Sequence, residues 1–434
     1  MLANKAEAAS AAAPGGKQHA AFFRQSGWLM FAAIASGAMS WAVHFLNKKI
    51  PNAEYAVFGT LLMVAACVPT MPLQMVFAQQ SALAMATNRE RQLAGMVRLT
   101  LYWITGLWAV LALGVLLFQG AIVARWQLPG PGGLWITLGV ILITVWSPIF
   151  LGMMQGRQDF FWMGWSAIAG GAGRIVVATV LVLGFACGAT GMMAGALIGG
   201  GVMTAIAIWR SRDMWSLRAE PFDKKKSLGQ VIPLMLGFGA CQFLFTSDTM
   251  FAKAFFDGDA LKPYVAAGTL SRALLWLVLP MAAVMFPKLV HSSAKAEKTN
   301  LMGIVVLGTG VLAICGMLVL WLVGPWVVRL VYKTGDVAET VRLIPWYAGA
   351  MVPLALANVL VNDLLARSHF RVVPSVVVLA VGYGFALPSV MSHFPDPHEG
   401  LPRALQTLGA FNFLLLVACA WYSFRKPTAA TGAR

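Results

Sequence analysis

Five charged side chains interrupt long apolar runs of this sequence, and their types are those that bind anions or couple to small cations. Three are basic, Arg174, Lys253 and Arg272, and two are acidic, Asp248 and Asp363. A charged group at the centre of a lipid bilayer costs about 2.5–3.5 kcal/mol on insertion scales. Where such runs cross a membrane, each charge is expected to be paired or to line an aqueous cavity.

Asp248 and Arg272 have the spacing of an ion pair between neighbouring helices. Asp248 lies eight residues before Phe256, where one apolar run ends, and Arg272 lies eight residues after Tyr264, where the next begins. Similar depths on adjacent helices favour a salt bridge. The pair is either structural, each charge neutralising the other, or it lines a hydrated cavity that handles an anionic substrate or a coupling ion. We favour the cavity.

The other three charges have less defined partners. Arg174 lies midway along its run in "GGAGRIVV", without an obvious acidic partner in its half of the chain, which favours a cavity. Lys253 lies near a helix end, where its side chain either lines a cavity or extends to the membrane interface. Asp363 lies beside two asparagines near the inner end of its helix. That position is more typical of a capping or interfacial role, and Asp363 joins Asp248 as a candidate for coupling or gating.

Motifs for catalysis or metal binding are missing from the sequence. It has no Gly-rich phosphate loop, nucleophile elbow or zinc-binding H-E-x-x-H. Asp257 and Asp259 are the nearest approach to paired acids, but Gly258 between them also suits a plain turn. His393 and His398 flank a loop more typical of solvent than of a metal. We therefore expect no enzyme, metal site or cofactor, with H⁺ or Na⁺ as the candidate coupling ion.

The elements that position these charges are membrane-spanning helices. Hydrophobic residues make up 59% of the chain and charged residues only 11%, whereas a soluble domain carries about 25% charged residues. A membrane helix needs about 20 mostly apolar residues. Twelve such runs are predicted: 27–46, 57–80, 99–122, 133–154, 161–184, 191–209, 229–253, 265–289, 301–324, 344–365, 372–391 and 405–424.

Charge placement orients these helices. The 32 Lys and Arg exceed the 16 Asp and Glu, which in a soluble protein would suggest nucleic acid. Here the segments on the side of the N-terminus hold more than twice as many basic residues as those on the other side, which predicts cytoplasmic termini. The expected organisation is a flexible cytoplasmic tail, a six-helix lobe, a cytoplasmic linker, a second six-helix lobe and a cytoplasmic tail, at 1–26, 27–209, 210–228, 229–424 and 425–434.

Short repeats relate the two halves. The pattern Y-x-x-x-G-T-L occurs at 55–61 and 264–270, and R-x-x-F occurs at 157–160 and 367–370. Six crossings per half make this a parallel repeat about an axis along the membrane normal. The predicted fold is all-α, a polytopic membrane protein with about twelve helices in two lobes around a central cavity. Tyr55 and Tyr264 are expected to be equivalent interfacial anchors.

Several of these motifs resemble one known family. Polysaccharide and oligosaccharide-lipid flippases of the multidrug/oligosaccharidyl-lipid/polysaccharide exporter superfamily share an Asp in the seventh helix, a Y-x-A-A opening the eighth, a following Arg, and F-P near its inner end. The corresponding positions here are Asp248, 264–267, Arg272 and 286–287. "AEYAVFGTL" is similar to the family's E-Y-G-x-F element, with Ala56 in place of the usual Gly. "GMMQGRQDFFWMG" followed by "GRIVVATVLVL" resembles its G-x-x-Q-G stretch and the Arg of the next helix, here Arg174.

This resemblance implies a flippase that turns a lipid-diphosphate-linked oligosaccharide across the bacterial cytoplasmic membrane by alternating access, for cell-surface polysaccharide assembly. Arg174, Arg272 and Lys253 would bind the anionic head group, and Asp248 and Asp363 would serve coupling or gating. The implied partners are the lipid-linked glycan, membrane lipid and glycan polymerase or export machinery, with a monomeric protein and no nucleic acid.

Three alternatives stay open. A multidrug exporter of the same fold would be expected to have an acid-rich cavity. Lipid II flippases also resemble the chain but typically have fourteen helices, against the twelve expected here. A membrane-embedded glycan polymerase or ligase is the alternative of a different class.

Overall fold

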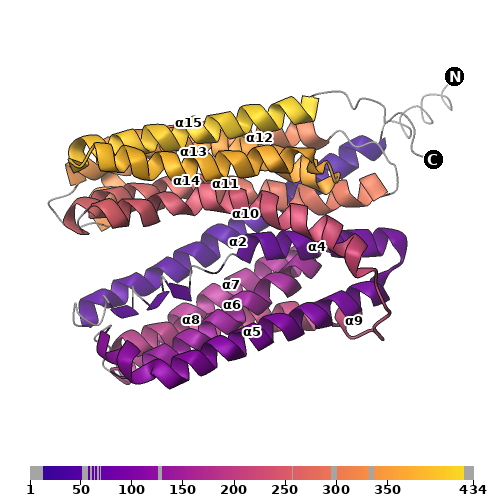
Figure 1. Ribbon diagram of the computed structural model, residues 1–434, viewed down its shortest axis with the longest axis horizontal. Coiled ribbons are helices and arrows are strands. Elements are labelled where there is room, and N and C mark those ends of the chain that lie inside the picture. Colours follow the sequence, from indigo (N-terminus) through magenta and orange to yellow (C-terminus); the bar gives the residue numbers. More distant parts are fainter. Residues whose placement is uncertain are drawn as a thin grey trace, which may run out of the picture. The chain divides into compact units, whose positions relative to one another are not determined.

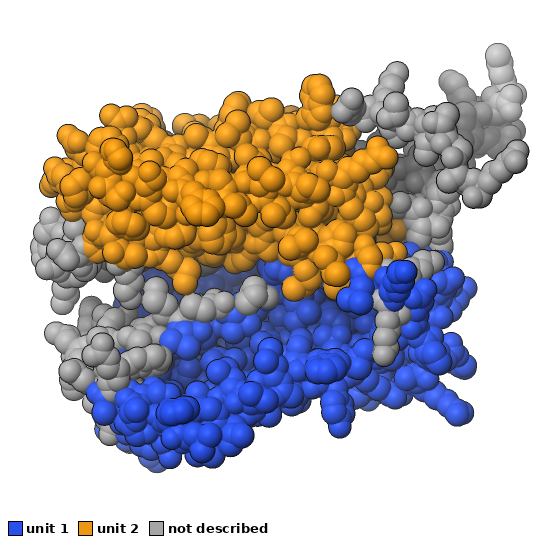
Figure 2. Space-filling view, in the orientation of Figure 1, with its two compact units in different colours: residues 1–228, 294–296 blue, residues 229–293, 297–434 orange. Residues whose placement is uncertain are grey.

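Every regular element in the described part of the chain is a helix (Figure 1). The computed structural model describes residues 13–50, 57–58, 61–62, 64–65, 68, 70–125, 130–256, 258–294, 301–331 and 337–424. The chain divides into two compact units, Met1–Leu228 with Ala294–Ala296, and Gly229–Ser293 with Glu297–Arg434 (Figure 2).

Six long helices make up the described part of the first unit. They are α2 (Ala13–Ala42), α4 (Thr70–Thr87), α5 (Glu90–Arg125), α6 (Gly132–Gly156), α7 (Phe160–Thr179) and α8 (Gly188–Arg210). Three shorter elements extend or follow them: the 3₁₀ helix η1 (Val43–Lys49), the π-helical turn η2 (Val180–Gly184) and α9 (Arg212–Trp215). Because α2, η1, α6, α7, η2 and α8 pack closely, polar groups placed on their inner faces lie within one bundle.

The second unit also has six long helices in its described part. They are α10 (Lys224–Phe255), α11 (Gly258–Ala294), α12 (Leu301–Val331), α13 (Val337–Ala366), α14 (Val373–His393) and α15 (Pro397–Phe424), with the 3₁₀ helix η3 (Phe370–Val372) before α14. Helix α13 lies at the centre of this unit, since almost every residue in its second half is buried.

Eleven of the twelve predicted runs correspond to helices long and apolar enough to cross a membrane, counted in the described residues. The exception is the run 57–80, in which residues 59–60, 63, 66–67 and 69 lie outside the described residues, while α4 continues to Thr87. The first helix also differs, because α2 begins at Ala13, inside the expected flexible tail 1–26. Pro14 lies in the first turn of α2, where proline suits a helix start.

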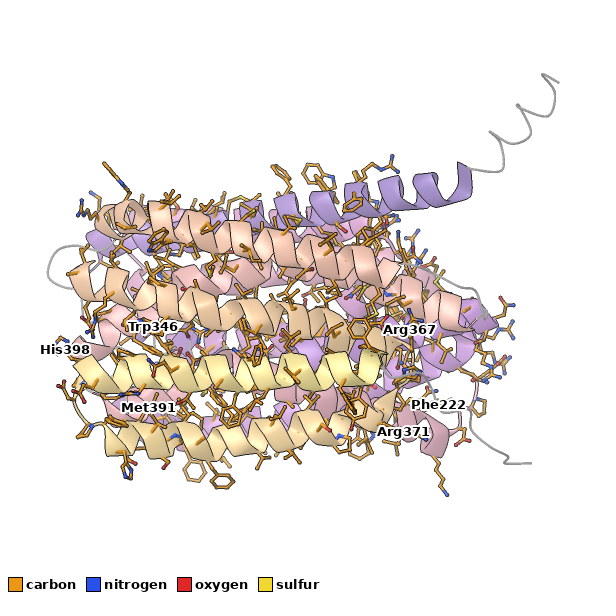
Figure 3. All side chains as sticks on the ribbon, turned by 90° about the horizontal axis from the view of Figure 1, so that it is seen from above. Phe222, Trp346, Arg367, Arg371, Met391 and His398 are labelled. Atoms are coloured by element: carbon orange, nitrogen blue, oxygen red, sulfur yellow. The ribbon has the colours of Figure 1, made fainter. Side chains whose placement is uncertain are left out.

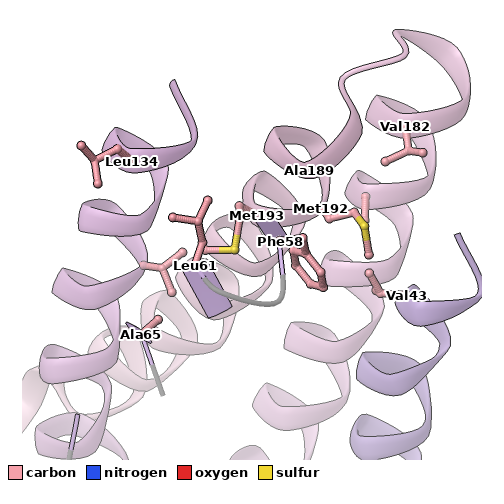
Figure 4. Packing of buried hydrophobic residues seen from close by; sticks show 11 residues of the cluster. Val43, Phe58, Leu61, Ala65, Leu134, Val182, Ala189, Met192 and Met193 are labelled. Carbon is pink, nitrogen blue, oxygen red and sulfur yellow. The ribbon is translucent and has the colours of Figure 1, made fainter. Parts of the chain in front are cut away.

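An apolar cluster fills the end of the first unit near η1 (Figure 4). Phe58 and Leu61 are almost fully buried there, against Met192 and Met193 of α8 and Leu134 of α6. The segment that contains Phe58 and Leu61 is thereby packed between α6 and α8, next to the site described below.

The R-x-x-F elements form the same turn in both units. The second residue of each has a left-handed backbone, with φ of 62° at Gln158 and 58° at Ser368. The third residues also agree, with φ −81° and ψ 58° at Asp159 and φ −79° and ψ 65° at His369. A non-glycine residue with positive φ is uncommon. The repeat read from the sequence is therefore a repeat of local structure at this turn.

Candidate functional site

A partly open cavity of about 420 Å³ in the first unit is lined by α2, α4, α6, α7 and α8. Four hydroxyl groups and one guanidinium give it polar character. They belong to Ser36, Ser40, Thr70, Thr144 and Arg174. None of the described residues that line it is acidic. The cavity therefore offers hydrogen-bond donors and one positive charge to whatever occupies it.

Arg174 is the charged group of this cavity. Its Nε is buried and has no hydrogen-bond partner, and no described acidic side chain forms an ion pair with it. The residue as a whole is partly buried, and a buried polar atom without a partner is costly. An anion in the cavity would supply the missing partner, because a guanidinium presents several N–H donors in a planar fork that matches carboxylate and phosphate oxygens.

Close contact between α7 and α8 fixes the backbone of Arg174. A Cβ added at Gly199 of α8 would overlap the carbonyl oxygen of Gly170, and it would lie 2.7 Å from Cβ of Arg174. Only glycine at position 199 allows the two helices to approach this closely. The glycines at this contact thus set the position of the Arg174 backbone, as small residues do where membrane helices approach closely.

A second polar cluster surrounds Asp248 in the second unit. Nη2 of Arg272 lies 2.5 Å from Oδ1 of Asp248, and the side chains are 15% and 1% exposed. The hydroxyl of Tyr264 donates to Oδ2 of Asp248 at 3.0 Å, and Tyr347 of α13 donates to the same oxygen. The ion pair expected from the equal distances to the α10–α11 turn is therefore present.

Other contacts hold the guanidinium of Arg272 in place. Its Nη2 donates to Oγ1 of Thr249 at 2.8 Å and its Nε to the carbonyl oxygen of Phe245 at 3.2 Å. The guanidinium carbon lies 5.3 Å from the ring centroid of Tyr347, within the range of cation–π attraction. Both oxygens of Asp248 are thus hydrogen-bonded and its charge is neutralised, so a cation at this carboxylate would have to displace Arg272.

Asp363 forms a separate ion pair near the C-terminal end of α13 in the second unit. Its Oδ1 accepts from Nε of Arg367, one turn later in α13, at 2.9 Å. Figure 3 shows Arg367 and Arg371 at one end of these helices, with Trp346 and His398 at the other. This position near a helix end agrees with the capping or interfacial interpretation. The side chain of Lys253 lies outside the described residues, so its expected place beside the head group stays a prediction.

Residue type and spacing alone did not identify several members of these clusters. Tyr264 is fully buried and bonded to Asp248, so the expectation of an interfacial anchor is wrong for it, while Tyr55 lies outside the described residues. Tyr347 has no local signal, since it reaches Asp248 from a helix far along the chain. Ser36 and Ser40, one helical turn apart, could have been recognised as a polar stripe in an apolar run.

In the described part of the chain, no group of three or more His, Cys, Asp or Glu side chains is placed to hold a metal ion.

The architecture is that of known transporters. A transporter of the MOP superfamily from Pyrococcus furiosus, described as having a binding pocket of reverse polarity, has a TM-score of 0.76 at 14% identity; the match covers 93% of this chain and 95% of the transporter. A multidrug resistance MATE family transporter in an outward-facing conformation has a TM-score of 0.75 at 13% identity, with the same coverage. The MATE transporter VcmN of Vibrio cholerae, in its bent form, has a TM-score of 0.67 at 14% identity, covering 92% and 95%. At these identities the likeness shows the fold.

Fold and spans together define a multi-pass membrane protein with the architecture of MATE and MOP-superfamily transporters. Residues 133–430, more than half of the chain, match the model of the family described as lipid II flippase MurJ, and the chain belongs to that family. As a member of a flippase family it is a transporter and not an enzyme. No curated protein matches the chain.

Proposed function

We propose that this protein flips a lipid-diphosphate-linked saccharide across the bacterial cytoplasmic membrane by alternating access, as a monomer with both termini in the cytoplasm. One observation carries the proposal: the cavity of the first unit contains Arg174 with an unpartnered Nε and hydroxyl groups around it. A diphosphate is a dense anion whose oxygens accept from a guanidinium and from hydroxyls. The sugar would pass through hydrated space while the lipid tail stays in the membrane.

Two saccharides fit this chemistry. Family membership favours lipid II, whereas the motifs around Asp248 and Arg272 resemble those of flippases for longer oligosaccharides in polysaccharide assembly, which would place glycan polymerase and export machinery among the partners. Both ligands share the diphosphate, which is the part that Arg174 would bind. Export of cationic drugs is disfavoured, because the described lining of this cavity has a basic residue and no acid.

The second unit would supply the switch. In the state described here Arg272 is held by Asp248. In another state, protonation of Asp248 or binding of Na⁺ to it would release the guanidinium, which would then join Lys253 at the head group. Asp363 would gate by exchanging its bond to Arg367. A ligand shifts such an equilibrium only by its difference in affinity for the two states, so head-group binding and Arg272 release would be coupled.

Replacing Arg174 tests the proposal. Loss of a hydrogen bond to a charged group costs about 1.5–3 kcal/mol, so we expect Arg174→Ala to weaken binding of a diphosphate-linked saccharide lipid by about 10-fold to 100-fold. Arg174→Lys keeps the charge and should retain part of the affinity. The measurement is equilibrium binding to the full chain in nanodiscs, together with flipping in vesicles read by enzymatic access to the head group.

Arg403→Ala is the matched control, because Arg403 is exposed and belongs to the second unit. It should leave binding and flipping unchanged. Equal behaviour of Arg174→Ala and the wild type would contradict the assignment of the cavity, and vesicles in which the wild type moves no diphosphate lipid would contradict the function itself.

A further inference from the structure

A second cavity of the first unit is apolar and opens between α5 and α6, with a volume of about 470 Å³. Leu111, Val115 and Ile122 line it from α5, and Leu134, Leu138 and Ile141 line it from α6. Within each helix the spacing of these residues is three, four or seven, so they form one stripe per helix. The cavity thus lies between two facing apolar stripes.

Hydrogen bonds between the two helices keep the cavity in shape. The indole nitrogen of Trp108 in α5 donates to the carbonyl oxygen of Leu138 at 2.9 Å, and the indole nitrogen of Trp146 in α6 donates to Oγ1 of Thr105 at 3.0 Å. Beyond Trp108 the helices hold a gap. Thr137 is the one polar residue among the described residues of the lining. Its hydroxyl donates to the carbonyl oxygen of Gly133 at 2.7 Å, so no free polar side chain of this described lining faces the gap.

This apolar cavity and the Arg174 cavity share walls. Leu138 and Ile141 of α6 face the apolar cavity, whereas Thr144, one turn further, faces the Arg174 cavity. The short segment before α4 divides them in the same way, since Val64 faces the apolar cavity and Ala65 the polar one. An anion-binding space and a hydrocarbon-lined space therefore lie on adjacent faces of the same two elements.

We infer that the cavity between α5 and α6 binds the hydrocarbon chain of the lipid whose anionic head occupies the Arg174 cavity. The inference rests on the proposed function. Membrane lipid is as apolar as the cavity, so binding gains little from hydrophobicity and depends on van der Waals fit. A preformed gap between helices that two indole hydrogen bonds tie together selects a chain by shape. Its position next to the Arg174 cavity selects the chain attached to a bound head group.

Chain-length dependence tests this site. Two analogues with the same diphosphate saccharide, one on a short and one on a long isoprenoid chain, are compared by equilibrium binding to the full chain in phosphatidylcholine nanodiscs. We expect the wild type to prefer the long chain by about tenfold. Val115→Trp, which fills the cavity, should remove this preference and leave the affinity for the short analogue unchanged.

Leu117→Trp is the matched control, because Leu117 is on the same helix but 71% exposed and outside the cavity. It should keep the preference for the long chain. Equal affinities of the two analogues for the wild type, or equal behaviour of Val115→Trp and Leu117→Trp, would overturn the inference and indicate that bulk lipid fills the gap.

A chain without a head group separates failure of this inference from failure of the proposed function. A photoreactive long-chain isoprenyl alcohol should crosslink to the residues of α5 and α6 that line the cavity, and Val115→Trp should abolish that crosslinking. If neither diphosphate analogue binds but these crosslinks form, the chain site stands and the head-group function is wrong. Crosslinks spread evenly over the exposed face of α5 would overturn the chain site.

Discussion

Replacing Asp248 with asparagine should lower the free energy of unfolding by about 3–5 kcal/mol, because removal of one partner leaves the other charge buried without compensation. Arg272 is only 15% exposed in the pair, and neither Thr249 nor the Phe245 carbonyl carries a charge to replace the carboxylate. Arg272→Met should cost a similar amount, since it leaves Asp248 charged and buried. The measurement is thermal or denaturant unfolding of the purified full chain.

The double variant Asp248→Asn with Arg272→Met should recover most of this stability, because neither charge of this buried pair remains. Arg91→Met gives the scale, since it breaks the pair of Arg91 with Glu220, whose side chains are 64% and 48% exposed. Exposed pairs contribute about 0–1 kcal/mol. A loss for Asp248→Asn no larger than that for Arg91→Met would show that the Asp248 pair is not the dominant electrostatic contact of its unit.

The same double variant decides between the two interpretations of the pair. If Asp248 and Arg272 are only structural, a folded double variant should flip lipid at the rate of the wild type. If Arg272 is released during the transport cycle, the double variant should fold and bind through Arg174 but fail to flip. The stability measurement and the transport measurement are therefore independent.

The number and approximate position of the membrane helices could be predicted from hydropathy. The lengths of the apolar runs located eleven helices, but the helices extend beyond these runs: α5 begins at Glu90 and ends at Arg125, whereas the predicted run covered 99–122. Hydropathy detects only the residues in the hydrocarbon core. The backbone stays helical through the polar interface until a turn, such as the one at Gln158, interrupts its hydrogen bonds.

The candidate sites were predictable only where a local signal existed. Asp248 and Arg272 could be paired because a short turn joins their helices. The number of residues between each charge and that turn then gives the depth of the charge in the membrane. Tyr347 reaches the same carboxylate from α13, and only tertiary packing reveals that contact. Arg174 was recognisable as a buried charge, yet the hydroxyls around it come from α2, α4 and α6, and no pattern in one sequence shows that these helices converge.

Gly199→Ala should both destabilise the protein and weaken head-group binding. The new methyl group would overlap the carbonyl oxygen of Gly170 and lie 2.8 Å from the backbone nitrogen of Arg174. Both neighbours are helix backbone, so relief requires α7 and α8 to separate. Overpacking of this kind costs about 1–3 kcal/mol, and the displaced segment is the one that carries Arg174. The measurements are thermal unfolding and diphosphate-lipid binding.

Gly201→Ala is the control for this effect, because it is on the same helix and a Cβ there has no neighbour within 4 Å. Alanine is favoured over glycine in a helix by about 0.5–1 kcal/mol, so Gly201→Ala should be neutral or stabilising and should bind lipid normally. If the two variants behave alike, the approach of α7 to α8 does not position Arg174. If Gly199→Ala loses stability and affinity while Gly201→Ala loses neither, the affinity of the cavity depends on a helix contact outside the head-group ligands themselves.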